Sequence, residues 1–193
     1  MEAAFAALTG RPDACSSFSF AGMTDRAIAR AGFLAVGEHA TAERIEALIA
    51  AYLQSLEGEL GSSAGYRVLP GVSEVLAALR LRSGCAIGLG TGNVRPGATA
   101  KLRRGGLAEH FDFGGFGCDH EERAELLRIG AERGAARLGH ARARCRVVVI
   151  GDTVRDVQAA LAIGAECIAV GTSGSALADL QQAGAAAVHA DLT

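Results

Sequence analysis

The run Arg146–Asp156, with the sequence Arg-Val-Val-Val-Ile-Gly-Asp-Thr-Val-Arg-Asp, constrains the fold more than any other part of the chain. Its four consecutive β-branched residues, Val147–Ile150, make a strand that is apolar on both faces, as in the middle of a parallel sheet. Gly151 ends this strand, and apolar residues then recur at helical spacing as far as Gly164. The run therefore predicts a buried parallel strand that leads directly into a helix.

Two carboxylates follow the predicted strand. Asp152 stands where the side chain emerges at the carboxyl end of the strand, and Asp156 lies four residues later on the first turn of the helix. Ligands of open α/β sheets bind at this end, and two neighbouring acids usually share a cation or a basic partner. A second interpretation stays open, in which Asp152 is only the N-cap of the helix.

The rest of the chain divides into a helical part and an alternating part. Residues 1–65 predict helices without a strand, the longest of which, Thr41–Glu59, has Thr41 as its N-cap. Glycines and serines over residues 58–65 predict a flexible joint. From Cys85 onward, strands alternate with helices, which predicts an α/β fold with a doubly wound parallel sheet. The expected strands are Cys85–Gly90, Phe111–Phe116, Val147–Ile150, Cys167–Val170 and Ala187–His189.

Charge and cysteine usage exclude several classes of partner. A formal net charge of -2 argues against a nucleic-acid-binding surface, and no apolar run approaches the length that spans a membrane. The five cysteines are scattered without any Cys-x-x-Cys spacing. Cys85 and Cys167 fall in strand-like runs, so we expect both to be small buried side chains in a reducing cytoplasm.

A glycine-rich turn stands at the end of the first expected strand. Thr91, Gly92 and Asn93 supply a hydroxyl and free backbone N–H groups, which suit an anion such as phosphate. Lys101 follows eight residues after Asn93 on the next helix, where it can lean back over the turn. A hydroxyl, a lysine and a carboxylate pair at one sheet edge predict a phosphoryl site with a divalent cation.

These residues, in this order, resemble three motifs of the haloacid dehalogenase superfamily, and most of all those of its phosphoglycolate-phosphatase-like hydrolases. The resemblance implies a helical cap over residues 1–65 and a Rossmann-like core over residues 66–193. It also implies a magnesium-dependent phosphatase that acts on a small phosphorylated metabolite through an aspartyl-phosphate. The substrate itself is left open, because in this family the cap selects it.

The same resemblance assigns roles to individual residues. Thr91 would hydrogen-bond the transferring phosphoryl group, together with the turn that contains Gly92 and Asn93, and Lys101 would neutralise its charge. Asp152 would bind Mg²⁺, and Asp156 would support the metal or the lysine without binding the ion directly. Arg26, at the start of a helix in the cap, is a possible contact for the substrate.

One motif of the family is missing from the chain. The family places a strand ending in Asp-x-Asp-x-Thr before the cap, and its first Asp is the nucleophile. No Asp-x-Asp occurs in this sequence, and neither Asp13 nor Asp25 follows an apolar strand. We therefore expect a chain that begins late relative to the family, is inactive as written and binds Mg²⁺ weakly. In the family this strand separates the two that end near Thr91 and Ile150, so we expect no ladder between those two.

Two alternatives remain. The chain can be a degenerate member of the family that serves as a non-catalytic binding module, which the missing motif favours. It can also be a nucleotide-binding or S-adenosylmethionine-binding enzyme that uses the glycines of residues 88–92. This glycine run departs from Gly-x-Gly-x-x-Gly, because Asn93 stands at the third glycine. It also gives no role to Lys101 or to Asp152.

Overall fold

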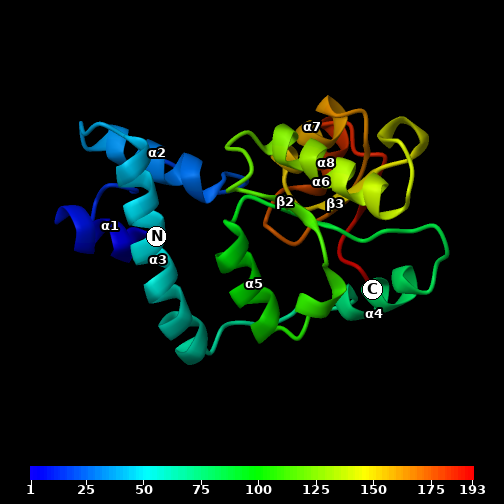
Figure 1. The fold of residues 1–193 in the computed structure, drawn as a ribbon, viewed down its shortest axis with the longest axis horizontal. Coiled ribbons are helices and arrows are strands. Elements are labelled where there is room, and N and C mark those ends of the chain that lie inside the picture. Colours follow the sequence, from blue (N-terminus) through cyan, green and yellow to red (C-terminus); the bar gives the residue numbers. More distant parts are fainter.

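The computed structural model describes all 193 residues and divides into a helical unit and a larger α/β part (Figure 1). The helical unit comprises α1 (Glu2–Thr9), α2 (Asp25–Ala35) and α3 (Ala42–Ser62). The α/β part comprises α4 (Val72–Arg80), β1 (Leu89–Thr91), α5 (Arg95–Arg104), η1 (Ala108–His110), β2 (Gly114–Phe116), α6 (Arg123–Arg137), η2 (Arg142–Arg144), β3 (Val148–Gly151), α7 (Val154–Ala162), β4 (Glu166–Val170), α8 (Leu177–Gln182) and β5 (Ala187–His189).

The helical unit has a hydrophobic core of its own. The rings of Phe5 and Phe33 meet edge to face with their centroids 5.1 Å apart, and both side chains are fully buried. Leu48 of α3 is buried in the same cluster. Thr41 is the N-cap of α3, as predicted, and its hydroxyl accepts a hydrogen bond from the backbone N–H of Arg44.

The flexible joint predicted over residues 58–65 is wrong in its first half. Helix α3 continues through Gly58 and Gly61 and ends only at Ser62. A glycine inside a helix costs about 1 kcal/mol relative to alanine, and the packing of the preceding turns against α1 and α2 outweighs that cost. The chain leaves the helix at Ser63, where the backbone becomes extended.

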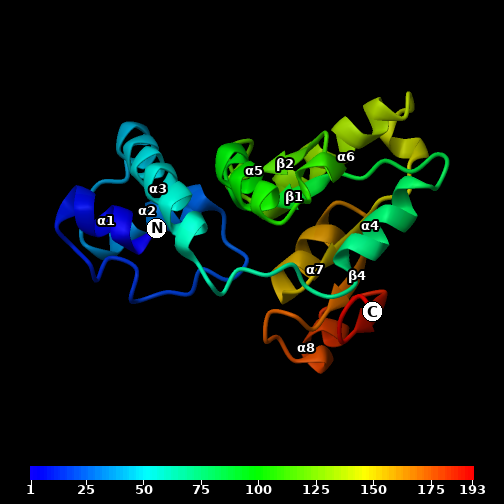
Figure 2. The ribbon, with the colours of Figure 1, turned by 90° about the horizontal axis from the view of Figure 1, so that it is seen from below.

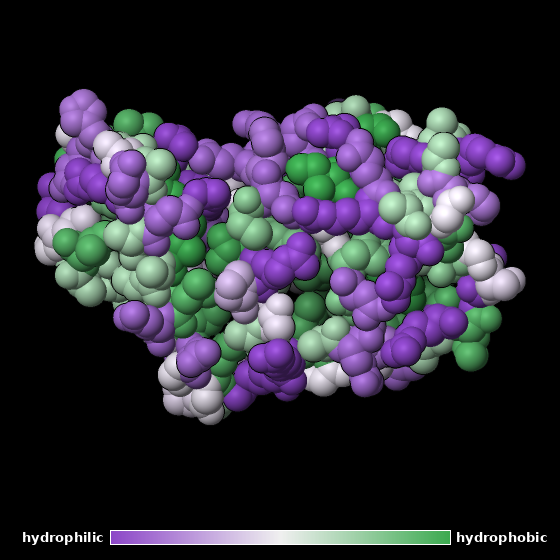
Figure 3. Space-filling view, viewed as in Figure 1, coloured by the Kyte–Doolittle hydropathy of each residue, from purple (hydrophilic) through white to green (hydrophobic).

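The helical unit packs directly on the α/β part. Gly97 of α5 lies against α3, where an added Cβ would meet Leu53 at 3.3 Å, and Val94 belongs to the core cluster of the helical unit. Apolar residues are visible between α3 and α5 in the space-filling view (Figure 3). A domain boundary at residue 65 therefore stays a prediction, since α5 shares a core with the preceding helices.

The parallel strands form two separate sheets. β1 pairs with β2, and β3, β4 and β5 form a second sheet in that order, with every pairing parallel. Figure 2 shows β1 and β2 with α6 in the upper part of the view, and β4 with α7 and α8 below. The prediction that no ladder joins the strands ending near Thr91 and Ile150 is confirmed.

The prediction that Val147–Ile150 is buried on both faces is wrong. The face of this sheet that carries Val149 and Cys167 packs against α7 and α8. The opposite face is open, because Val148 and Ile150 remain 41% and 43% exposed. β3 also lies at the edge of its sheet and lacks a partner on one side. The apolar run has the composition of a strand in the interior of a sheet. In the structure, however, this strand has one neighbouring strand, and helices cover only one of its faces.

The expected strand at Cys85–Gly90 is shorter and later than predicted. Only Leu89–Thr91 forms a ladder, because its partner β2 is equally short. Cys85 is exposed, contrary to expectation, whereas Cys167 on β4 is fully buried as expected. No helix in the chain is both long enough and apolar enough to cross a membrane.

Candidate functional site

The turn after β1 is held together by its own polar side chains. The Thr91 hydroxyl accepts a hydrogen bond of 3.2 Å from the backbone N–H of Asn93. The Asn93 carbonyl accepts one of 2.9 Å from the N–H of Gly117, which follows β2. Thr91 and Asn93 are half-buried, so the turn is fixed in shape and still reachable from solvent.

Lys101 reaches back from α5 to this turn. Its Nζ donates a hydrogen bond of 3.1 Å to Oδ1 of Asn93, and it also lies 5.9 Å from the centre of the Tyr52 ring. Lys101 is the one lysine of the chain. The hydroxyl of Thr91, the amide of Asn93 and the ammonium of Lys101 thus form one connected group at the end of β1.

The helical unit touches this group through the start of α2. The backbone N–H of Asp25 donates to the carbonyl of Gly92 at 2.8 Å, and the Asp25 carboxylate accepts from Asn93 Nδ2 at 3.0 Å. Gly92 allows the approach, because an added Cβ would lie 2.4 Å from the carbonyl oxygen of Met23. A residue with a side chain at this position would push the two parts of the molecule away from each other.

Asp152 and Asp156 have different environments. Asp156 is 3% exposed, and its Oδ2 accepts from the N–H of Asp152 at 3.2 Å and from the N–H of Thr153 at 3.0 Å. The N-cap of α7 is Thr153, which forms a capping box with Asp156, so the interpretation of Asp152 as the N-cap is wrong. Asp152 itself accepts from the hydroxyl of Thr172 at 3.1 Å through Oδ2.

Asp156 has the basic partner that a buried acid requires. Arg123, at the start of α6, donates to Asp156 Oδ1 from Nε at 2.6 Å and from a terminal nitrogen at 2.5 Å. Both carboxylate oxygens of Asp156 are therefore occupied by donors. Asp156 holds β3, α6 and α7 together, and Asp152 keeps the carboxylate oxygen that is free to accept a ligand.

The residues present fit Mg²⁺ only in part. Mg²⁺ takes six oxygen ligands in octahedral geometry and usually keeps several waters. The chain contains no group of three or more acidic, histidine or cysteine side chains arranged to hold a metal ion. Asp152 alone offers an uncommitted carboxylate oxygen at this sheet edge, so the chain's own side chains supply a single anionic ligand.

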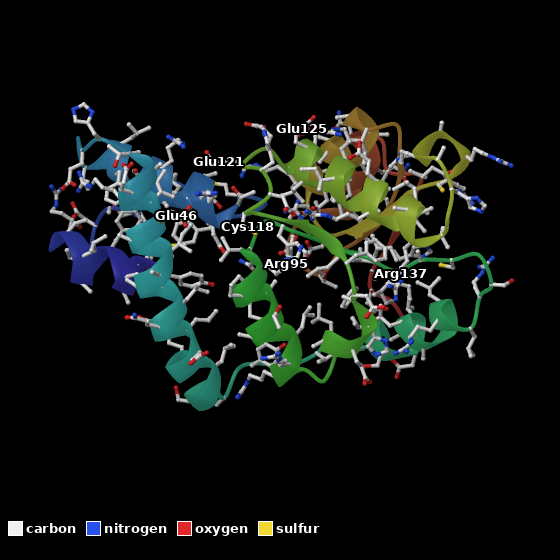
Figure 4. The ribbon with its side chains drawn as sticks, viewed as in Figure 1. Glu46, Arg95, Cys118, Glu121, Glu125 and Arg137 are labelled. Carbon is white, nitrogen blue, oxygen red and sulfur yellow. The ribbon has the colours of Figure 1, made fainter.

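Arg26 does not point freely into the site. It forms an ion pair with Glu46 of α3, and its side chain is 28% exposed. Its neighbour Arg30 is paired to Glu121, with Nε and a terminal nitrogen 2.9 and 2.7 Å from the carboxylate oxygens. This pairing lowers the pKa of Glu121 through hydrogen bonds from Arg30. Figure 4 shows Glu121 beside α2, on the loop that leads into α6.

A recess of about 380 Å³ lies at the same junction. Thr24 and Ala27 of the helical unit line one side, and Arg123, Arg155 and Gln158 line the other. Thr91, Lys101 and Asp152 are absent from its lining. The recess therefore lies apart from the group at the end of β1.

The predicted site residues fall into two groups. Hydrogen bonds link Thr91, Asn93 and Lys101 in one group, and Asp152 and Asp156 in the other, with none between the two. Sequence reasoning missed Thr172, which it could have found, because Thr172 follows the strand Glu166–Val170 at the same sheet edge. It also missed the contact of Asp25, whose partner Asn93 is 68 residues away and carries no local signal.

Comparison with solved structures supports the fold. A hydrolase from Pseudomonas syringae is 22% identical, with a TM-score of 0.63, and the match covers 90% of this chain and 76% of that one. A HAD family hydrolase from Deinococcus radiodurans R1, with bound phosphate and sodium, is 23% identical with a TM-score of 0.51, over 88% of this chain and 72% of that one. No curated protein sequence matches the chain.

These distant structures support the fold alone, whereas a sequence model of a protein family identifies the family. The model of the haloacid dehalogenase-like hydrolases matches residues 7–164, which include the end of α1, all of α2 and α3, and the strands β1, β2 and β3. The match also spans the two polar groups at the ends of β1 and β3. The chain therefore belongs to the haloacid dehalogenase-like hydrolases, a family of hydrolytic enzymes with this α/β fold.

Proposed function

We propose that this chain is a member of the Mg²⁺-dependent phosphatases of its family, which act on a small phosphorylated metabolite through an aspartyl-phosphate. The observation that carries the proposal is the group at the end of β1, where a hydroxyl, an amide and the one lysine meet on a glycine-containing turn. Such a group suits the three oxygens of a phosphoryl group. The phosphate bound to the Deinococcus relative is consistent with this choice.

Thr91 and Lys101 have distinct roles in this proposal. The Thr91 hydroxyl can rotate from the turn to donate to a phosphoryl oxygen, because it only accepts a bond from Asn93 at present. The ammonium of Lys101 has three hydrogens, of which Asn93 takes one, so it can offset the charge of the phosphoryl group. Arg26 would contact the substrate only after exchanging its ion pair with Glu46.

The metal would bind at Asp152, the one carboxylate of the site that has a free oxygen. When bound, Mg²⁺ would supply positive charge that offsets the charge of the phosphoryl group. One carboxylate is a weak site for Mg²⁺ unless further oxygens join it. Asp156 would contribute indirectly, by holding the N–H groups of Asp152 and Thr153 in place.

We also propose that the 193 residues alone are inactive. An aspartyl-phosphate needs a carboxylate that is free to attack phosphorus. Asp156 is occupied by Arg123 and by backbone N–H groups, and Asp25 is buried against Asn93 and Val94. Asp152 is the candidate metal ligand, which leaves no carboxylate in the two groups for the attack.

The proposal is tested by hydrolysis of para-nitrophenyl phosphate in the presence of Mg²⁺. The 193-residue chain is expected to give no turnover above background. A version preceded by an apolar strand ending in Asp-x-Asp-x-Thr is expected to give turnover, which Asp152→Asn then abolishes. Turnover by the 193-residue chain that disappears in Asp152→Asn would contradict the inactivity of the chain.

A non-catalytic binding module is the second candidate, favoured by the absence of a free carboxylate at the end of β1. It predicts that the chain binds inorganic phosphate and that the extended version stays inactive. Calorimetric titration of phosphate into wild type and into Lys101→Met measures the binding. Loss of phosphate binding in Lys101→Met, together with no turnover by the extended version, favours the module over the phosphatase.

We place the protein in a reducing, cytoplasmic setting. All five cysteines are free thiols, and Cys85 and Cys118 are exposed. Exposed thiols persist in compartments that keep cysteines reduced, which supports this location.

A further inference from the structure

The carboxylate of Asp25 is buried without a cationic partner. The residue is 4% exposed, and none of the ion pairs of the chain includes it. Its Oδ2 accepts from the backbone N–H of Val94 at 2.8 Å, and its Oδ1 accepts from Asn93 Nδ2 at 3.0 Å. Val94 is the N-cap of the ten-residue helix α5, whose amino end favours a negative charge. These contacts offset the cost of burying the charge.

The side chain of Asn93 is held from both sides. An ionised carboxylate only accepts hydrogen bonds, and an ammonium only donates them. The NH₂ of Asn93 must therefore face Asp25, and its carbonyl oxygen must face Lys101. The result is a chain of hydrogen bonds that runs from Asp25 through the Asn93 amide to Nζ of Lys101.

We propose that Asp25 is a positioning residue for Lys101. It fixes the orientation of the Asn93 amide, and the amide oxygen fixes the ammonium. Asp25 belongs to α2 of the helical unit, whereas Asn93 and Lys101 belong to the α/β part. The position of Lys101 therefore depends on the helical unit being docked. That Lys101 is positioned to bind a phosphoryl group rests on the function proposed above.

Other contacts hold the same junction without touching Lys101. Arg30 pairs with Glu121, and the Thr24 hydroxyl donates to the backbone carbonyl of Glu121 at 3.1 Å. These contacts make a control available, because Arg30→Gln removes the ionic link and leaves Asp25 and Asn93 intact. A loss of docking can thus be distinguished from a loss of the Asp25 carboxylate.

The single lysine makes the ammonium directly observable. Growth on lysine labelled with ¹³C at Cε labels Lys101 alone, and the ammonium keeps its three hydrogens. The wild-type spectrum is expected to contain one lysine Cε signal that is displaced from its position in the urea-unfolded chain. The signal of each urea-unfolded variant serves as the reference for that variant.

Asp25→Asn is expected to shift the Lys101 signal toward the unfolded position, because the Asn93 amide is no longer held. Arg30→Gln is expected to leave the signal in place. An unchanged signal in Asp25→Asn would overturn the proposal. Equal shifts in both variants would also overturn it, since docking alone would then explain the effect.

Asn93→Ser covers the case in which Asp25→Asn unfolds, which circular dichroism detects. Asn93→Ser removes the bridging amide, leaves the bond from Val94 to Asp25, and is expected to shift the Lys101 signal toward the unfolded position. Where both single variants fold, their shifts are expected to be equal and the double variant is expected to add nothing further. An unshifted signal in a folded Asn93→Ser, or additive shifts in a folded double variant, would refute the chain of hydrogen bonds.

This experiment uses no hydrolysis, so it separates the positioning from the proposed function. Addition of inorganic phosphate to the labelled wild type tests the phosphate site independently. If phosphate leaves the Lys101 signal unmoved while Asp25→Asn shifts it, the proposed function fails and the positioning stands. If phosphate moves the signal and Asp25→Asn does not, the positioning fails and the phosphate site stands.

Discussion

Two nitrogens of Arg123 on α6, Nε and a terminal nitrogen, lie 2.6 and 2.5 Å from the same carboxylate oxygen of Asp156, Oδ1. Asp156 is almost fully buried, and its other oxygen accepts from the N–H groups at the start of α7. The pair joins two helices that cover different sheets, since α6 packs on β1 and β2 and α7 packs on β3 and β4. It is therefore a structural link between the two sheets.

Replacing Arg123 is expected to destabilise the protein more than replacing an exposed arginine of the same helix. Arg123→Gln leaves Asp156 buried without its cation, which costs about 3 kcal/mol. Arg128→Gln is the control, because Arg128 forms only exposed pairs with Glu125 and Glu132, which contribute little to stability. Urea unfolding followed by circular dichroism measures both. Equal losses in the two variants would contradict the role given to Arg123.

Two threonines that cap helices are expected to differ in their contribution to stability. Thr24 caps α2 and is 1% exposed, and its hydroxyl also donates to the Glu121 carbonyl. Thr41 caps α3 on the surface with a longer bond. Thr24→Ala is expected to cost about 2 kcal/mol and Thr41→Ala about 0.5 kcal/mol. Thermal unfolding of both variants measures the difference. A larger loss of stability in Thr41→Ala than in Thr24→Ala would contradict the stabilising role of the two hydrogen bonds of Thr24.

The stabilising contribution of Asp119 is expected to be lost in acid. Hydrogen bonds from Arg133 hold the pKa of Asp119 below its ordinary value of 3.8, helped by the backbone N–H of Phe116. Because the folded pKa is depressed, the contribution of Asp119 is fully present above 3.8 and is lost as the pH falls through the folded pKa. Asp119→Asn lacks this contribution at every pH.

The comparison of wild type with Asp119→Asn tests this linkage. Urea midpoints are measured at about pH 6.5 and about pH 3, the two sides of the titration. Wild type is expected to exceed the variant at the higher pH, with the gap narrowing at the lower pH. Asp112→Asn is the control, because Asp112 forms only an exposed pair with Arg137. A difference in urea midpoint between wild type and Asp119→Asn that stays constant with pH would contradict the role of the Asp119 titration.

The thiols are expected to react with Ellman's reagent in two classes. Burial raises the pKa of Cys167 to about 11, with a smaller effect from the charge of Asp156. Cys167 therefore stays protonated and inaccessible near neutral pH, and burial also raises the pKa of Cys15. Cys85 and Cys118 are exposed and are expected to react at once. Peptide mapping after brief labelling identifies them, and early labelling of Cys167 would contradict its burial.

Patterns confined to a short stretch of sequence predicted the local structure well. The N-cap at Thr41, the helix that follows Gly151 and the spacing of Lys101 from Asn93 all depend on residues within two or three turns of one another. Backbone geometry alone brings such residues together. The α/β class followed from the alternation of strand and helix patterns, which is also a local signal.

Features that depend on distant contacts were predicted less well. Cys85 has the neighbours of a strand residue, yet it lies outside the ladder because β2 begins only at Gly114, opposite Leu89. Gly58 and Gly61 have the composition of a joint, yet the packing of α3 keeps them helical. The carboxylate of Asp25 meets Asn93 only because α2 docks on the turn after β1. None of these contacts leaves a pattern in the local sequence.

The division of the strands into two sheets bears on how the molecule unfolds. Within one sheet, backbone hydrogen bonds pass from strand to strand, so its strands are expected to open together. No such bonds connect β1 with β3, and side chains such as Arg123 and Asp156 carry the connection between α6 and α7. The sheet β3-β4-β5 with α7 and α8, and the sheet β1-β2 with α6, are then expected to exchange their amide hydrogens as two separate cooperative units. Their coupling depends on the pair between Arg123 and Asp156 and on the apolar contact of Leu126 and Leu127 with Ala159.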